Sequence, residues 1–294
     1  MNDPPTARPR IIERHHDQGE GREMTSPASA SLSGDQAQRP AFRWLLGVQV
    51  LATTVFGVVP LLAPGLFATV TGYSGDDQLV YRFAGAGATG YFVAAVLALA
   101  WRSSWHELRL ALVATFSFTA VAAVGCAWSL LEGDRHWVVF VVLLAAIAFA
   151  LLAGYWLRAD SGPDTGPGQP ISGVWLAVIA IATIAAAVFG LVGLLPASAT
   201  GPLAGLQGTD GWIYRMSGAA CFGYAPAGLL ALMLRDYRRM RVQNLAGMTF
   251  NATAAAAAWL AAFTGGGGLI APVVAVAASV FAILLALLDR RYAR

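Results

Sequence analysis

Long apolar stretches alternate with short polar segments along almost the whole of this chain. Each of the longest stretches is close to the length of about 20 residues that an α-helix needs to cross the hydrocarbon core of a bilayer. They cover residues 44–67, 80–101, 110–131, 137–157, 172–196, 211–234, 244–263 and 269–288. This pattern predicts an all-α integral membrane protein with eight transmembrane helices.

Composition supports the same class of protein. Of the 294 residues, 57% are hydrophobic and 12% are charged, whereas soluble domains carry about 25% charged residues. All the Lys and Arg positions are arginine, and with the abundant Ala and Gly this indicates a bacterial source. The arginines lie between the apolar stretches rather than on one surface, so we expect no nucleic-acid partner.

Two polar segments divide the chain. Residues 1–40 are rich in Pro, Ser, Gln, Asp and Arg, and they contain too few large apolar residues to offset the entropy of ordering, which predicts a disordered tail. Because Met24 begins a typical bacterial N-terminal phrase, we hypothesise that residues 1–23 are an upstream extension. The Pro- and Gly-rich segment 159–170 is predicted to link two halves, residues 41–158 and 171–294.

The arginines also predict the topology. One set of connections and both ends carry Arg39, Arg43, Arg102, Arg109, Arg158, Arg235, Arg238, Arg239, Arg241, Arg290, Arg291 and Arg294. The opposite connections hold Arg135 beside Asp76, Asp77, Glu132, Asp134 and Asp210. Short cytoplasmic loops carry an excess of basic residues. The sequence therefore predicts a multi-pass protein of the cell inner (plasma) membrane with both termini in the cytoplasm.

A shift of 133 residues brings the two halves into register. Gly75, Asp77, Tyr81, Arg82, Gly85, Gly90, Tyr91 and Arg102 then meet Gly208, Asp210, Tyr214, Arg215, Gly218, Gly223, Tyr224 and Arg235. After one inserted residue the offset is 134, and residues 115–119 meet residues 249–253. This spaced agreement predicts two tandem four-helix repeats. An even number of helices gives both repeats the same, parallel orientation, about a pseudo-two-fold axis along the membrane normal.

Small residues favour central positions for the second and sixth predicted helices. Ala86 and Gly90 are four residues apart, as are Ala219 and Gly223, so each pair lies on one helix face. Such faces let helix backbones approach closely in a membrane. We expect these two helices to pack against their neighbours through these faces.

Arg82 and Arg215, each preceded by a tyrosine and by an aspartate five positions back, are the main candidates for a site. The favoured interpretation is structural: the arginines reach outward to lipid headgroups, while Asp77 and Asp210 cap their helices. The alternative is an outward-facing pocket for an anion or lipid headgroup. Its residues would be Tyr81, Arg82, Tyr214, Arg215, Asp77 and Asp210.

Other motifs do not support chemistry. The Gly-x-Gly-x-x-Gly pattern at residues 85–90 lies inside a predicted membrane helix, whereas a dinucleotide site needs a preceding strand. Cys126 and Cys221 have no metal-binding spacing, and we interpret both as packing residues. We therefore predict no catalytic residue, no metal and no cofactor.

Each predicted four-helix unit resembles the DoxX-like class of small bacterial membrane proteins. The resemblance rests on helix number, size and the Pro- and Gly-rich outer loop that follows Phe56-Gly57, with Pro60 and Pro64. It implies a fold and carries no catalytic residue. We expect a non-catalytic accessory, binding or scaffold protein whose partners include membrane lipids. The alternative is a transporter, or a binder of a lipid or small molecule, with an outward-facing site between the repeats.

Overall fold

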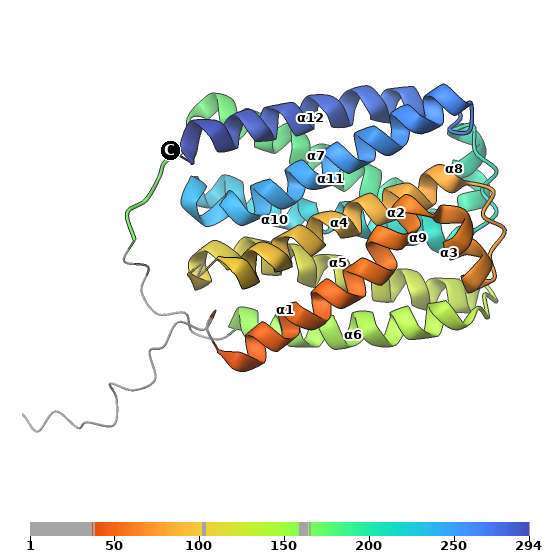
Figure 1. Cartoon of the computed structure of the whole chain (residues 1–294), viewed down its shortest axis with the longest axis horizontal. Helices are drawn as coiled ribbons and strands as arrows, with labels where there is room; N and C mark the ends of the chain where they lie inside the picture. The colour runs from red at the N-terminus through yellow and green to blue at the C-terminus, as the bar shows by residue number, and fades with distance from the viewer. Residues whose placement is uncertain (1–36, 38, 102–103, 159–163, 165, 294) are drawn as a thin grey trace, which may run out of the picture. The chain divides into compact units, whose positions relative to one another are not determined.

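The computed structural model describes residues 37, 39–101, 104–158, 164 and 166–293 (Figure 1). Within these ranges the chain is helical without a β-strand, and an isolated bridge pairs Pro170 with Asp236. The predicted disordered tail, except for residues 37, 39 and 40, and the hypothesised extension 1–23 lie outside the described residues. The helices are α1 (Pro40–Thr53), the π-helical η2 (Thr54–Val58), α2 (Val59–Leu62), α3 (Pro64–Thr71), α4 (Gln78–Ala100), α5 (Trp105–Leu131), α6 (Trp137–Arg158), α7 (Gly173–Leu194), α8 (Ala197–Leu203), α9 (Gly211–Phe222), α10 (Tyr224–Leu234), α11 (Tyr237–Thr264) and α12 (Ile270–Tyr292).

Eight segments of the described chain are long and apolar enough to cross a membrane. They are Pro40–Leu62, Gln78–Ala100, Trp105–Leu131, Trp137–Arg158, Gly173–Leu194, Gly211–Leu234, Tyr237–Thr264 and Ile270–Tyr292. Each coincides with one of the eight predicted spans, so the prediction of eight apolar helices is confirmed. The first span joins α1, η2 and α2, and the sixth joins α9 and α10.

The first span differs in detail from its prediction. We predicted continuous helix over residues 44–67, but the helix ends at Leu62 and α3 begins separately at Pro64. A residue before proline is disfavoured in the helical conformation, and Ala63 adopts φ −133° and ψ 61°. The π-helical turn η2 ends at Val58, two residues before Pro60, which has no backbone N–H to donate to the ladder. Pro64 therefore accounts for the helix break at Ala63, and Pro60 accounts for the π-helical turn before it.

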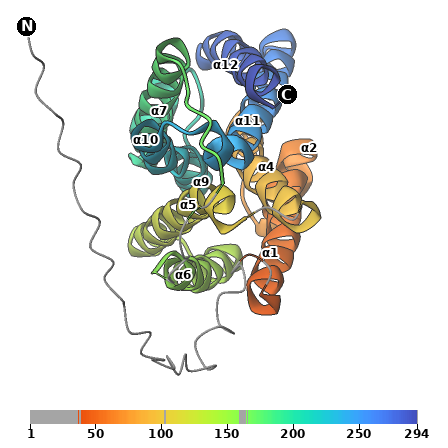
Figure 2. The same cartoon turned by 90° about the vertical axis from the view of Figure 1, so that its left-hand side faces the viewer.

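The two halves of the chain interlock at the centre of the bundle. Helix α4 packs against α1 of its own half and against α11 of the other half. In the same way α9 packs against α7 and against α5. Seen end-on in Figure 2, α4, α5, α9 and α11 lie in the middle, with α6 and α12 toward opposite edges. Each half therefore contributes helices to the packing of the other.

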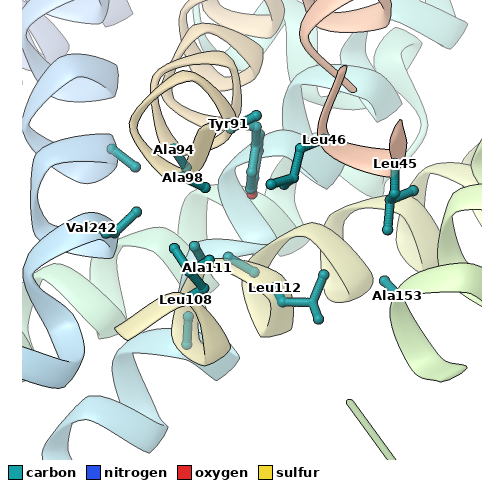
Figure 3. Close-up of a cluster of buried hydrophobic side chains, with 14 of the residues drawn as sticks. Leu45, Leu46, Tyr91, Ala94, Ala98, Leu108, Ala111, Leu112, Ala153 and Val242 are labelled. Atoms are coloured by element: carbon teal, nitrogen blue, oxygen red, sulfur yellow. The ribbon is translucent and has the colours of Figure 1, made fainter. Parts of the chain in front are cut away.

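Alanine and aromatic residues fill the core in the first half. Figure 3 shows Leu46 of α1 beside Tyr91 of α4 and Leu45 on the side of Ala153 of α6, in a buried cluster that also draws on α5 and α11. Beside them, Phe42 packs edge-on against Trp105 and Trp156, with ring centroids 5.5 and 5.4 Å apart. The small alanines allow helices to approach, and the few large rings fill what remains.

The predicted small-residue faces are buried at the helix crossings. Ala86 and Ala219 are fully buried, and Gly90 and Gly223 are buried beside them. The hydroxyl of Tyr224 packs directly against Gly90, and the hydroxyl of Tyr91 packs directly against Gly223. Tyr91 donates to Ala220 O at 2.9 Å and Tyr224 donates to Gly87 O at 3.2 Å. The glycines leave the space that these two reciprocal hydrogen bonds require.

Replacing Gly90 with alanine should therefore destabilise the bundle. A Cβ at this position would overlap the Tyr224 hydroxyl and would lie 2.7 Å from Ala246 O. Overpacking of this kind costs about 1–3 kcal/mol of unfolding free energy. Thermal unfolding of the detergent-purified protein measures the effect. Gly47→Ala is the control because no atom lies within 4 Å of its Cβ position, and equal melting temperatures for the two variants would contradict the prediction.

Candidate functional site

The charged side chains gather at the two ends of the helical bundle. We call the end where α1 begins and α12 finishes the arginine-rich end, because the described arginines there include Arg39, Arg158 and the group Arg235–Arg241. The other end, called the opposite end, holds the aspartates of the predicted site. Arg82 and Arg215 lie in the first turns of α4 and α9 at that end.

Two tyrosine–aspartate pairs join the halves at the opposite end. Tyr81 donates to Asp210 Oδ2 and Tyr214 donates to Asp77 Oδ2, each at 2.7 Å. All four side chains are buried, and each hydrogen bond links residues 129 or 137 positions apart. We call this set of four residues the tyrosine–aspartate clamp.

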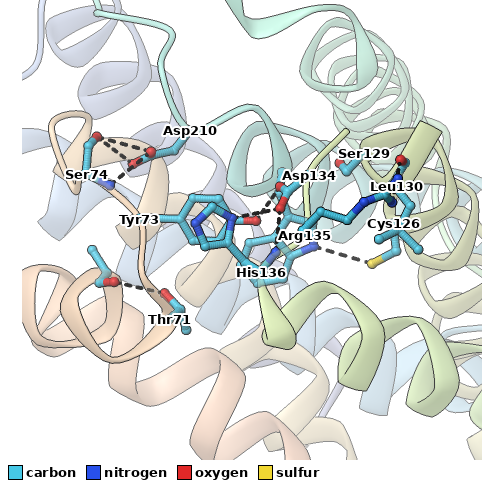
Figure 4. A network of polar contacts seen from close by, with 12 residues as sticks. Thr71, Tyr73, Ser74, Cys126, Ser129, Leu130, Asp134, Arg135, His136 and Asp210 are labelled. Atoms are coloured by element: carbon cyan, nitrogen blue, oxygen red, sulfur yellow. Dashed lines mark hydrogen bonds and ion pairs between the residues drawn. The ribbon is translucent and has the colours of Figure 1, made fainter. Parts of the chain in front are cut away.

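Backbone amides complete the hydrogen bonding of the clamp. Asp77 accepts from the N–H groups of Gln207 and Gly208 at 2.8 and 2.7 Å. Asp210 accepts from the N–H groups of Ser74 and Gly75 at 3.2 and 2.9 Å. Figure 4 shows Ser74 turned toward Asp210. Each carboxylate thus binds the loop that precedes the other aspartate, at positions that the 133-residue shift pairs.

These contacts correct the predicted capping role. Asp77 and Asp210 do occupy the N-cap positions of α4 and α9, but neither side chain makes a capping hydrogen bond to its own helix. Gly75 and Gly208 adopt φ values of +73° and +74°, a conformation that favours glycine. That turn presents the amide of each loop to the carboxylate of the other half. Periodicity could not reveal this, since the partners are far apart in sequence.

Arg215 lies inside the protein, so the prediction that it reaches lipid headgroups is wrong. Its side chain is 2% exposed and donates to Ser129 Oγ at 2.7 Å and to Glu132 Oε2 at 2.5 Å. The guanidinium also stands over the ring of Trp128, 5.3 Å from its centroid. Residues of α5, supplied by the other half, therefore neutralise the charge.

Arg82 has a different environment. It is half-buried, and within the described chain it makes no hydrogen bond or ion pair. The 134-residue offset pairs Glu132, the partner of Arg215, with Gly266, so the second half supplies no acid at the matching position. Of the six residues predicted for an anion or headgroup pocket, Arg82 alone keeps its charge free of protein partners. Anion binding at these residues stays a prediction.

A further polar cluster at the opposite end was not anticipated from the sequence. Tyr73 donates to Asp134 Oδ2 at 2.5 Å, and Asp134 Oδ1 accepts the backbone N–H of His136 at 3.0 Å (Figure 4). The Tyr73 ring also stacks on Trp212, with centroids 5.5 Å apart. Burial, reinforced by the hydrogen bond to Asp134, raises the pKa of Tyr73 well above its usual value. The cluster ties the loop after α3 to the loop before α6.

Ion pairs hold the described part of the predicted linker at the arginine-rich end. Asp164 pairs with Arg238 and with Arg239 at the start of α11. Burial opposes ionisation of Asp164, but the hydrogen bonds from Arg238 and from the Gly166 N–H outweigh it and hold the pKa of Asp164 below its usual value. These arginines therefore have protein partners. Residues 159–163 and 165 of the linker lie outside the described chain.

A cavity of about 280 Å³ lies in the second half of the bundle. It is lined by residues of α7, α8, α9, α10, α11 and α12, with Val80 and Phe83 of α4. Lining residues extend from Leu285 toward the arginine-rich end to Ile270 at the opposite end, a distance of roughly 22 Å along α12 at 1.5 Å per residue. Helices α7 and α12 flank the cavity and make few contacts with each other.

A small void lies between α1, α4 and α5 in the first half. Its volume is about 20 Å³, and its lining includes Phe42 and Gln49. Gln49 donates to Tyr91 O and to Thr115 Oγ1, which places its side chain across the gap. The 133-residue shift pairs Gln49 with Ala182, which lines the large cavity. At this pair of positions the first half carries the larger side chain and the second half the smaller one.

The cavity wall is almost entirely apolar. Its few polar side chains include Thr183, Ser217, Gln243, Asn244 and Asn251, and none of the lining residues carries a charge. Across the described residues no group of His, Cys, Asp and Glu is arranged to hold a metal ion. This lining suits the hydrocarbon part of a ligand.

Comparison of the chain with protein-family models, curated proteins and solved structures finds no match in any of the three. The resemblance to DoxX-like proteins therefore stays a prediction.

Proposed function

We propose that this chain is a membrane protein without catalytic activity of its own that binds a lipid-like molecule between α7 and α12. The observation that carries this proposal is the apolar cavity of about 280 Å³ in the second half. An engineered apolar protein cavity of about 150 Å³ stays dry and binds benzene. A larger cavity with a similar lining therefore has room for a longer apolar ligand.

The flanking helices give such a ligand a direct route. Because α7 and α12 make few contacts with each other, a hydrocarbon chain enters from the bilayer between them without passing through water. The polar residues of the tyrosine–aspartate clamp already hydrogen-bond within the protein. We therefore favour the cavity over the clamp as the ligand site.

The proposed topology places the arginine-rich end in the cytoplasm and the protein in the plasma membrane. The positive-inside rule supports this orientation, since Arg135 is the arginine of the connections at the opposite end. We also propose that the halves are tandem repeats in parallel orientation. The reciprocal hydrogen bonds of Tyr91 and Tyr224 and of the clamp support a pseudo-two-fold relation.

Filling the cavity should remove the ligand. The double variant Ala182→Leu/Ala186→Leu places larger side chains on α7 within the cavity. Losing even two methylene groups of contact, at about 0.8 kcal/mol each, weakens binding about tenfold. Native mass spectrometry of the detergent-purified full chain should show a lipid adduct in wild type and its loss in the variant.

The matched control is Ala177→Leu, an exposed position on α7 that does not line the cavity. It should retain the adduct at the wild-type level. Equal adduct occupancy in wild type and in the double variant would show that the cavity is not the binding site.

A further inference from the structure

Two amide side chains stand side by side at one end of the cavity. Gln243 and Asn244 of α11 both line it and are 8% and 3% exposed. The 134-residue offset pairs them with Arg109 and Leu110, so the amides are particular to the second half. They stand in a wall that is otherwise mostly apolar.

The hydrogen bonding of these amides is incomplete. Gln243 makes no side-chain hydrogen bond to any described residue. Asn244 donates from Nδ2 to Leu285 O at 3.1 Å and to the Tyr237 hydroxyl at 3.4 Å, but its Oδ1 accepts no hydrogen bond. Buried polar groups are seldom left without a partner, because their desolvation is then uncompensated. The Gln243 amide, which lines the cavity, is therefore free to bind a polar group of a ligand.

Gln243 and Asn244 lie at the level of the membrane where the polar end of a lipid is found. Helix α11 begins at Tyr237, so Gln243 lies about 9 Å along its axis at 1.5 Å per residue. The 28 residues of α11 span about 42 Å, whereas the hydrocarbon core is about 30 Å thick. Gln243 and Asn244 thus lie close to the boundary between headgroups and hydrocarbon, and the apolar cavity continues from them into the bilayer.

The chemistry of the wall restricts the headgroup. No lining residue is charged, and a charge buried without a counter-charge is strongly disfavoured. The Gln243 amide both donates and accepts, whereas Asn244 Oδ1 has no surface open to the cavity. A hydroxyl group, which also donates and accepts, complements the Gln243 amide without bringing a charge.

We propose that the cavity binds an uncharged lipid whose polar end is a hydroxyl group. The hydroxyl hydrogen-bonds to Gln243, and the hydrocarbon chain lies along α12 toward Ile270. This inference rests on the proposed function, because it names the class of molecule that the same cavity takes.

A matched pair of probes tests the proposal. One is hexadecanol with a photoreactive diazirine in its chain, and the other is the methyl ether of the same molecule, which cannot donate a hydrogen bond. Each is titrated into the detergent-purified full chain, and the labelled residues are identified by mass spectrometry. We expect both probes to label α7 and α12, with the alcohol bound about five- to tenfold more tightly, the typical effect of one hydrogen bond.

Two variants separate the hydroxyl contact from the apolar contact. Gln243→Leu removes an amide that has no protein partner, so the fold should be unaffected, and it should reduce the preference for the alcohol to about twofold or less. Asn244→Leu is the contrasting variant: it removes the hydrogen bond to Leu285 O, so it should lower stability while the preference for the alcohol persists. Labelling by the ether should stay at the wild-type level in Gln243→Leu.

The possible results test the hydroxyl contact separately from the binding of an apolar molecule in the cavity. Equal binding of alcohol and ether to wild type, or an unchanged preference in Gln243→Leu, overturns the hydroxyl proposal while the apolar site stands. If neither probe labels α7 or α12, or if Ala182→Leu/Ala186→Leu labels as wild type does, the proposed function itself fails.

Discussion

Replacing Asp77 with alanine is expected to lower the free energy of unfolding by about 3–5 kcal/mol, the range for removing one partner of a buried polar network. Asp77 accepts hydrogen bonds from Gln207, Gly208 and Tyr214 in a site where it is 2% exposed. Without the carboxylate, two backbone N–H groups and a hydroxyl would be left with no partner inside the protein. Chemical or thermal unfolding of the purified protein in detergent measures the loss.

The neighbouring Asp76 provides a control with the same charge and almost the same position. It is exposed, and it accepts a hydrogen bond of 3.4 Å from Thr209. Asp76→Ala should change stability by no more than about 0.5 kcal/mol. If Asp77→Ala proves as stable as Asp76→Ala, the clamp does not hold the halves together.

Arg215→Ala is expected to cost about 3 kcal/mol, because it removes a buried cation together with its hydrogen bonds and packing. The side chain contacts Ser129, Glu132 and the Trp128 ring. Glu132 is 47% exposed, so water can solvate its carboxylate once Arg215 is gone. This keeps the expected loss below that for Asp77.

Arg82→Ala is the matched control, because the 133-residue shift pairs Arg82 with Arg215. Arg82 makes no ion pair within the described chain, so its replacement should change stability by about 0.5 kcal/mol or less. Both variants can be followed by thermal unfolding in the same detergent. Similar losses for the two arginines would mean that the contacts of Arg215 with α5 do not stabilise the fold.

The four residues of the tyrosine–aspartate clamp could be selected from the sequence, but their pairing could not. It selected Asp77, Tyr81, Asp210 and Tyr214 because they recur at one spacing, and the structure brings all four together. It did not show that each tyrosine pairs with the aspartate of the other half. A spacing identifies which residues correspond, but it carries no information on which half supplies the partner.

Other features gave only a weak signal in the sequence. Tyr73 and Asp134 are 61 positions apart and belong to no repeated pattern. Gln243 and Asn244 lie at the edge of a predicted span, where polar residues are common. The hydrogen bonds of Asn244 and the absence of any for the Gln243 side chain depend on how the other helices pack around α11, and local sequence does not encode that.

The sequence by itself determined the number of helices, their approximate limits and the unequal distribution of arginine between the two ends. Those properties follow from helix length and from the exclusion of charge from hydrocarbon, which act on each segment separately. Tertiary structure decided that α5 also packs against α9 and α11 against α4 of the opposite half, that Arg215 is buried against Glu132, and that a large cavity lies in the second half. These outcomes depend on the fit of side chains from distant parts of the chain, such as Gln49 in one half and Ala182 in the other.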